Sequence, residues 1–229
     1  MSEGRDTILN KLRAARRPFA DAAPRPQAYV PVTVQDDPSP EALLERFRAE
    51  LELLKGEVFV VDGDEAARAQ VQALLEQHNA RRVLAWDFAH VPVEGLAESI
   101  RALGVEIIQP DTHGPDRDAV LQRSKTAEVS LTGADAAAAT TGTLIVSTGP
   151  GKGRLPTVLA PVHIAIIRLD QLVTRIEDWV AAQRAKGLEV PTDVANFCFI
   201  TGPSRTGDIE MQLVLGVHGP GQLQVIVKR

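Results

Sequence analysis

The sequence predicts an α/β fold, namely a three-layer α/β/α sandwich with a mostly parallel sheet. Two observations indicate this class: short apolar runs alternate with longer amphipathic segments from residue 41 onward, and about 10 to 15 residues separate many of the runs. Parallel strands need crossovers of that length, because each strand must start again at the same edge of the sheet. A composition that is 44% hydrophobic and 24% charged fits an ordinary globular chain.

Residues 1–40 are predicted to form an N-terminal helix and a Pro-rich extended arm, and residues 41–229 a single α/β domain. Asp6 to Arg17 is a short amphipathic pattern, and the segment from Pro18 to Pro40 contains six prolines. The arm either docks at a distance, on another subunit of a homo-oligomer, or is a partly ordered tail.

The first half of the domain alternates regularly between the two kinds of element. Helices are predicted at Glu41 to Lys55, Asp64 to His78 and Val93 to Leu103, and strands at Val58 to Val61, Arg82 to Trp86 and Val105 to Ile108.

The second half continues the alternation but is richer in Gly and Pro. Strands are predicted at Val129 to Thr132, Thr143 to Ser147, Val162 to Ile167, Phe197 to Thr201 and Leu223 to Val227. Helices are predicted at Ala134 to Ala139, Val173 to Lys186 and about Thr206 to Leu215, with a loop at Thr148 to Pro161. Ligands of such folds lie outside the carboxyl ends of the strands.

The bulk properties exclude several classes of function. A net charge of -5 argues against nucleic-acid binding, which needs a concentrated surplus of Lys and Arg. The single cysteine, Cys198, can form no internal disulfide and cannot hold an iron-sulfur cluster, which usually needs four. There is no signal-peptide pattern and no apolar stretch of about 18 residues, so we expect a soluble, cytoplasmic chain without membrane contact.

The loop TGPGKGRLP, residues 148–156, combines glycines with Lys152 and Arg154 after an apolar strand. It is neither a Walker sequence nor a dinucleotide fingerprint, because its glycines are wrongly spaced and prolines interrupt the following helix. It is predicted to be either a flexible cationic lid over an anion or a mobile surface hairpin.

Two further groups of small or polar residues are ambiguous. Thr141, Gly142 and Thr143 precede a buried strand, where they can bind an anion or simply end a helical turn. His163 lies in an apolar strand and His218 in a Gly/Pro turn, where most histidines are structural or solvated. No metal-ligand spacing occurs, so no metal site is expected.

The stretch NFCFITGPSRTGDIEMQ, residues 196–212, is predicted to be a strand, a turn and the start of a helix. Ser204 or Thr206 can cap that helix, whose free amides would face an anion, with Arg205 adding a forked cationic contact. Asp208 in the first turn competes for the same amides. A capped turn that binds nothing is the alternative.

Three segments together resemble the LUD domain family, of the lactate utilization protein C (LutC) type: TGADAAAATTGTLIVST, GRLPTVLAPVHIAII and FITGPSRTGDIEMQLVLGVHGPGQLQVIV. The resemblance is strongest over residues 125–229. It implies a fold like the sugar-phosphate isomerase and CoA-transferase superfamily, and a role in oxidising L-lactate to pyruvate beside iron-sulfur partner proteins. It implies no cofactor on this chain and no established catalytic residue.

The resemblance also selects positions for a ligand site. Matched residues are Thr141, Gly142, Thr143, Gly153, Arg154, Leu155, His163, Thr201, Gly202, Pro203, Ser204, Arg205, Thr206, Asp208, Glu210, His218, Gly219 and Pro220. Thr140 stands where relatives often have an acid, and related transferases use an acid near there as a covalent nucleophile. Gly221 stands where relatives often have Arg, which removes an anion contact.

We therefore expect a component of an L-lactate utilization system that binds a small anionic ligand in a strand-end crevice. The alternatives are a free-standing transferase or ligase acting on a CoA thioester or phosphorylated small molecule, and a non-catalytic scaffold for the iron-sulfur partners. Whether the chain is itself an enzyme stays open.

Overall fold

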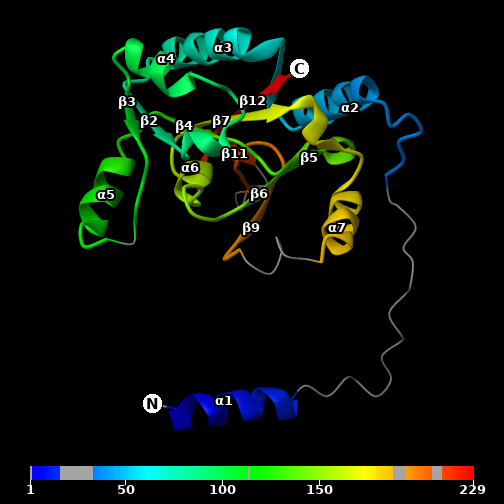
Figure 1. Ribbon diagram of the computed structural model, residues 1–229, viewed down its shortest axis with the longest axis vertical. Coiled ribbons are helices and arrows are strands. Elements are labelled where there is room, and N and C mark those ends of the chain that lie inside the picture. Colours follow the sequence, from blue (N-terminus) through cyan, green and yellow to red (C-terminus); the bar gives the residue numbers. More distant parts are fainter. Residues whose placement is uncertain (1, 16–32, 113, 188–193, 208–212) are drawn as a thin grey trace. The chain divides into compact units, whose positions relative to one another are not determined.

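The computed structural model describes residues 2–15, 33–112, 114–187, 194–207 and 213–229 (Figure 1). The chain divides into two units, Met1–Val32 and Thr33–Arg229. The described part of the first unit is helix α1 (Ser2–Ala15). Most of the Pro-rich segment lies outside the described residues.

Six parallel strands form the central sheet of the second unit, in the order β1-β12-β7-β4-β2-β3. They are β1 (Glu57–Val61), β2 (Arg82–Ala85), β3 (Glu106–Ile108), β4 (Val129–Thr132), β7 (Val162–Arg168) and β12 (Gln222–Lys228). The predicted α/β class and mostly parallel sheet are thus confirmed.

The described part of the second unit has six helices, of which four lie where the amphipathic patterns predicted them. They are α2 (Pro40–Leu53), α3 (Gly63–Gln77), α4 (Leu96–Ala102), α5 (Arg117–Ser124), α6 (Leu155–Val158) and α7 (Ile176–Ala185), with short 3-10 turns η1 (Phe88–His90), η2 (Ala139–Thr141) and η3 (Leu169–Gln171). α3 and α4 lie on one face, and α6 lies on the other (Figure 1). α5 and α6 were not predicted, because α6 is one turn long and the face of α5 is hardly apolar.

A second sheet, which the sequence did not indicate, packs beside the first. Its order is β8-β5-β6-β9, with β5 (Ala136–Ala138), β6 (Thr143–Ser147), β8 (Leu172–Val173) and β9 (Phe197–Ile200). β6 pairs antiparallel with both β5 and β9. The helical turn predicted at Ala134 to Ala139 is therefore wrong: alanines favour helix locally, but strand pairing on both sides of β5 decides its conformation.

The helix predicted from Thr206 to Leu215 is also wrong. β10 (Arg205–Gly207) pairs antiparallel with β11 (Leu213–Leu215), so the ends of that segment form a hairpin. The spacing of its apolar residues suited a helix, but backbone pairing between the two ends outweighs that spacing. The cap at Ser204 or Thr206 and the helix dipole expected there are lost with the helix.

Helix α2 connects the two sheets. Ser39 Oγ accepts a hydrogen bond from the amide of Ala42, 3.4 Å away, and starts the helix, whose buried face includes Phe47 and Leu51. The helix contacts β1 of the central sheet and the η2 turn that enters β6. Gly142, which ends that turn, has a φ of 58° and lies directly against the backbone of Leu51.

Replacing Gly142 with Ala should therefore destabilise the fold. A Cβ there would lie 2.7 Å from Leu51 N, which is backbone and cannot turn aside. With the strain of a positive φ, we expect the free energy of unfolding to fall by about 2–5 kcal/mol in urea denaturation. Gly153→Ala is the control, since its Cβ meets nothing within 4 Å and its φ is not positive. Equal stability of the two variants would contradict the α2 contact.

Candidate functional site

A cavity of about 210 Å³ lies at the amino ends of β7 and β12. We call it the His163 pocket; its lining residues are Thr157, Val158, His163, Phe199, Ile200, Thr201, Gly202, Pro203, Ser204, His218, Gly219, Pro220 and Leu223. Eight of the matched positions surround this one cavity, namely His163, Thr201, Gly202, Pro203, Ser204, His218, Gly219 and Pro220. Its place is at the opposite end of the central sheet from the one predicted, because Gly202 to Ser204 follow a strand of the second sheet.

The histidine is the polar centre of this pocket. His163 is 1% exposed, and its Nε2 hydrogen-bonds to Thr132 Oγ1 at 2.8 Å. Its Nδ1 is buried and has no hydrogen-bond partner in the part of the chain that the structure describes. Burial lowers the pKa of His163 from 6.5 to about 4, because the charged ring loses its hydration. The ring is therefore neutral at pH 7 and presents one unsatisfied nitrogen.

Two turns are hydrogen-bonded to each other beside the histidine. The Ser204 amide donates to Pro220 O at 2.8 Å, and the Gly216 amide donates to Ser204 O at 2.9 Å. Gly221 donates to Pro161 O at 2.9 Å, which ties the second turn to the start of β7. The GPS and HGP segments are thus brought together by backbone bonds that their own sequences do not reveal.

The TTGT segment, residues 140–143, is not part of the lining of the His163 pocket, and its hydroxyls hydrogen-bond to other threonines. Thr143 Oγ1 is 2.8 Å from both Thr141 Oγ1 and Thr201 Oγ1, so three hydroxyls form a chain. Thr140 is 3% exposed, and its Oγ1 accepts a hydrogen bond from Thr33 Oγ1 at 3.0 Å. A nucleophile at the Thr140 position would be buried away from the His163 pocket lining.

The predicted arginines lie apart. Arg205 is exposed, and its Nη2 donates to Thr201 O at 3.0 Å, next to Gly202 at the pocket. Arg154 instead lines a separate cavity of about 860 Å³ beside Trp86, Asp87 and Gln109, at the carboxyl ends of β2 and β3. Thr206 pairs with Val214 in the β10–β11 hairpin. Asp208 and Glu210 lie outside the described residues.

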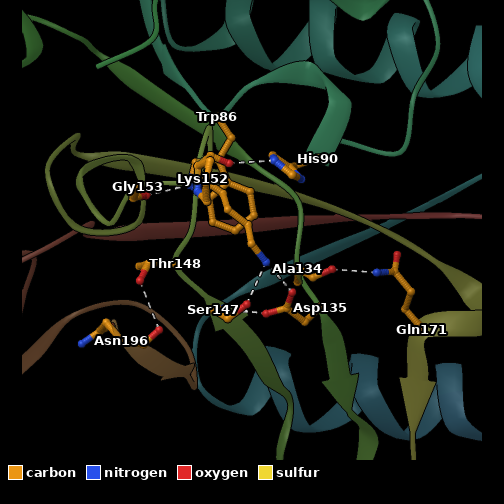
Figure 2. Close-up of polar contacts among 11 residues, drawn as sticks. Trp86, His90, Ala134, Asp135, Ser147, Thr148, Lys152, Gly153, Gln171 and Asn196 are labelled. Atoms are coloured by element: carbon orange, nitrogen blue, oxygen red, sulfur yellow. Dashed lines mark hydrogen bonds and ion pairs between the residues drawn. The ribbon is translucent and has the colours of Figure 1, made fainter. Parts of the chain in front are cut away.

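Lys152 and its partners are functional candidates that were missing from the predicted site. Lys152 Nζ donates to Asp135 Oδ1 at 2.9 Å and to Ser147 Oγ at 2.7 Å (Figure 2). The Ser147 amide donates to the other oxygen of Asp135. Asp135 follows β4 and Ser147 ends β6, so a search for polar residues at strand ends would have found both.

The glycine-rich loop is neither a free lid nor a loose hairpin. Its carbonyls accept three hydrogen bonds from the segment after β2: His90 Nε2 to Pro150 O, the Asp87 amide to Gly151 O and Trp86 Nε1 to Gly153 O, at 2.9, 2.7 and 2.8 Å. Two backbone bonds between Gly149 and Lys152 close the turn. These contacts hold Lys152 pointing inward (Figure 2).

The described ranges contain neither a metal-binding cluster nor a membrane-spanning helix. No three side chains of His, Cys, Asp or Glu gather there in a way that could hold a metal ion. None of the helices described has the length and apolar content to cross a lipid bilayer.

A family model and individual relatives both match most of this chain. Residues 44–227 match the LUD domain. Lactate utilization protein C of Halalkalibacterium halodurans is 30% identical over 227 residues, covering 96% of this chain and 95% of that protein. Lactate utilization protein C of Deinococcus radiodurans is 33% identical over 210 residues, covering 91% and 90%.

One solved structure shares the fold. A crystal structure of a DUF162 family protein from Deinococcus radiodurans has a TM-score of 0.60 at 24% identity, and the match covers 83% of this chain and 99% of that one. At that identity the likeness establishes the architecture alone.

The depressed pKa of His163 makes a prediction about stability and pH. The folded state releases the proton of this ring near pH 4 and the unfolded state near 6.5, so the unfolded state binds more protons between those values. The contribution of His163 to the free energy of unfolding is fully present above pH 6.5 and is lost as the pH falls toward 4. In that window the free energy of unfolding changes with a slope approaching about 1.4 kcal/mol per pH unit.

Urea denaturation of the wild type and of His163→Gln between pH 7 and 4.5 checks this. The free energy of unfolding should fall more steeply with acid in the wild type than in the variant, which lacks the group. Parallel slopes, or an NMR titration of His163 centred near 6.5, would show that the ring is not held neutral by burial.

Proposed function

The chain belongs to the LUD domain family, and we propose that it is a component of an L-lactate utilization system whose His163 pocket binds a small 2-hydroxy or 2-keto acid. Support for the pathway comes from relatives named lactate utilization protein C that align along almost the whole chain. Support for the ligand comes from the pocket.

The observation that carries the ligand assignment is the buried Nδ1 of His163, which has no partner among the described residues and belongs to a residue that lines a small cavity. A buried polar atom without a partner costs about 1–3 kcal/mol, which a ligand regains when it supplies the missing hydrogen bond. A volume of about 210 Å³ suits a small acid rather than a nucleotide. The hydroxyl or keto oxygen of such an acid is the complementary group for this nitrogen.

The charged end of the ligand needs a cation, and Arg205 is placed to provide it. Its Nη2 is already fixed on Thr201 O, beside Gly202 of the pocket lining, and the rest of the guanidinium is exposed. An arginine fork binds a carboxylate through parallel hydrogen bonds. In the proposed complex the carboxylate faces Arg205 at the rim and the 2-oxygen faces His163 inside.

The pKa of His163 favours binding over proton abstraction. A general base is most effective with a pKa near the working pH, and a ring whose pKa is about 4 accepts a proton weakly at pH 7. We assign His163 to orienting the ligand. Lactate oxidation releases electrons, and the single cysteine of this chain cannot hold a four-thiolate cluster, so iron-sulfur proteins are the proposed partners that accept them.

The transferase alternative is less well supported. A covalent mechanism would need a nucleophile at the Thr140 position, and that side chain is buried and hydrogen-bonded to Thr33. A scaffold without a ligand would leave the unsatisfied nitrogen of His163 unexplained.

Thermal unfolding with added L-lactate, pyruvate, CoA and a sugar phosphate tests the proposal. A ligand at a hundred times its Kd stabilises the folded state by about 2.7 kcal/mol, so lactate or pyruvate should raise the Tm. His163→Ala and Arg205→Ala should remove most of that rise and lower the lactate-dependent activity of the assembled system. Arg117→Ala, at a 60% exposed arginine on α5, is the matched control.

Different results point to different functions. A Tm rise with CoA or the sugar phosphate alone would favour the transferase. Lactate-dependent activity that is unchanged in both pocket variants would remove the proposed site and favour the scaffold.

A further inference from the structure

A third cavity, of about 360 Å³, lies at the opposite end of the central sheet from the His163 pocket, where β2 and β4 end. We call it the Lys152 pocket. It lies where the chain passes from β4 to β5, that is, from the central sheet to the second one. This is the carboxyl-end position at which open parallel sheets bind their ligands. Its lining includes Trp86, His90, Asp135 and Lys152.

Lys152 has an unused donor at this cavity. An ammonium group has three donors, and the structure shows two hydrogen bonds from Nζ, to Asp135 and Ser147 (Figure 2). The side chain of Lys152 is 19% exposed, so it is largely shielded but still reaches the cavity that it lines. Because the loop is bonded to the segment after β2, the ammonium is already in place before a ligand arrives.

Helix α7 supplies the other wall. Trp179 and Gln183 lie four residues apart, and Lys186 follows three residues later, so all three lie on the face of the helix that lines the pocket. The Lys152 and Lys186 charges against the Asp135 charge leave one formal positive charge among the lining residues. The lining exposes more polar than apolar surface.

We propose that the Lys152 pocket binds a hydroxylated carboxylate, with its carboxylate on Lys152 and its hydroxyls on Asp135 and Gln183. A single net positive charge suits a monoanion better than a phosphate dianion. Each oxygen of Asp135 accepts one hydrogen bond in the structure and has capacity for a second, which a hydroxyl can donate. The larger volume admits a longer acid than the His163 pocket does.

This site is independent of the proposed lactate pocket, and its occupancy can be measured separately. The chain has two tryptophans, and both line the Lys152 pocket, whereas neither lines the His163 pocket. Intrinsic tryptophan fluorescence therefore reports on the Lys152 pocket, and through Trp86 on the cavity beside Arg154, but not directly on the His163 pocket. The two proposals can then fail separately, one by fluorescence and the other by the His163 variants.

The experiment is a fluorescence titration of the full chain at constant ionic strength with acetate, L-lactate, D-gluconate and inorganic phosphate. We expect a saturable change in emission with gluconate, a weaker one with lactate, and little with acetate, which lacks hydroxyls, or with phosphate. No saturable change with either hydroxy acid would overturn the proposal, as would a response to phosphate alone.

Variants locate the response. Lys152→Gln should weaken gluconate binding at least about tenfold, because a charge-assisted hydrogen bond is lost. Lys186→Gln, at an exposed position, should weaken it a few-fold without affecting the fold. Lys125→Gln is the control: this exposed lysine is the C-cap residue of α5 and does not line the pocket, so the variant should bind gluconate as the wild type does.

Folding is checked by circular dichroism. Lys152→Gln can unfold because Asp135 then lacks its cation. In that case the double variant Lys152→Gln/Asp135→Asn, which removes both charges, takes the place of the single variant in the titration. Binding of wild-type strength in a folded variant without Lys152 would overturn the assignment.

Discussion

Close packing of α2 against the turn before β6 is the constraint on which both cavities depend. The helix also contacts the central sheet, so it sets how the second sheet lies against the first. Only a glycine at position 142 allows the backbone of the turn to approach Leu51 so closely. From this contact β6 runs to Ser147, beside Lys152, while its neighbour β9 leads to Gly202, beside His163. One packing contact thereby positions a wall of each pocket.

The two ends of the central sheet offer different chemistry. At the amino ends, burial keeps His163 neutral and leaves one ring nitrogen without a partner among the described residues. Arg205 is bonded there to Thr201, a residue of the pocket lining. At the carboxyl ends, Lys152 forms an ion pair with Asp135 in a partly shielded polar cavity. A neutral site orients a small ligand through one hydrogen bond, whereas a charged site attracts an anion and fixes its carboxylate. Together, the two proposals predict that the protein binds two different small molecules at once.

The hydrophobic pattern was sufficient for the central sheet, because each of its strands is a short apolar run and the crossovers suit parallel pairing. The same reasoning failed for Ala136–Ala138, where alanines have little β-propensity and pairing with β6 and β8 decides the matter. It failed again for Leu213–Leu215, which was predicted to be helical but pairs antiparallel with β10. The family motif selected His163, Gly202, Ser204 and His218, which line one cavity, but it also selected Arg154, which lines a different one.

The sequence by itself determined the fold class, the family and the small set of residues around His163, because hydrophobic periodicity and sequence motifs are local properties of the chain. Only the tertiary structure decided where those residues meet. Parallel pairing placed His163 at the amino end of its strand, and the second sheet brought Gly202 and Ser204 to it. Burial then set the pKa of the histidine, and the fixed loop turned Lys152 toward Asp135. Burial and distance depend on contacts between remote segments, which no single stretch of sequence records.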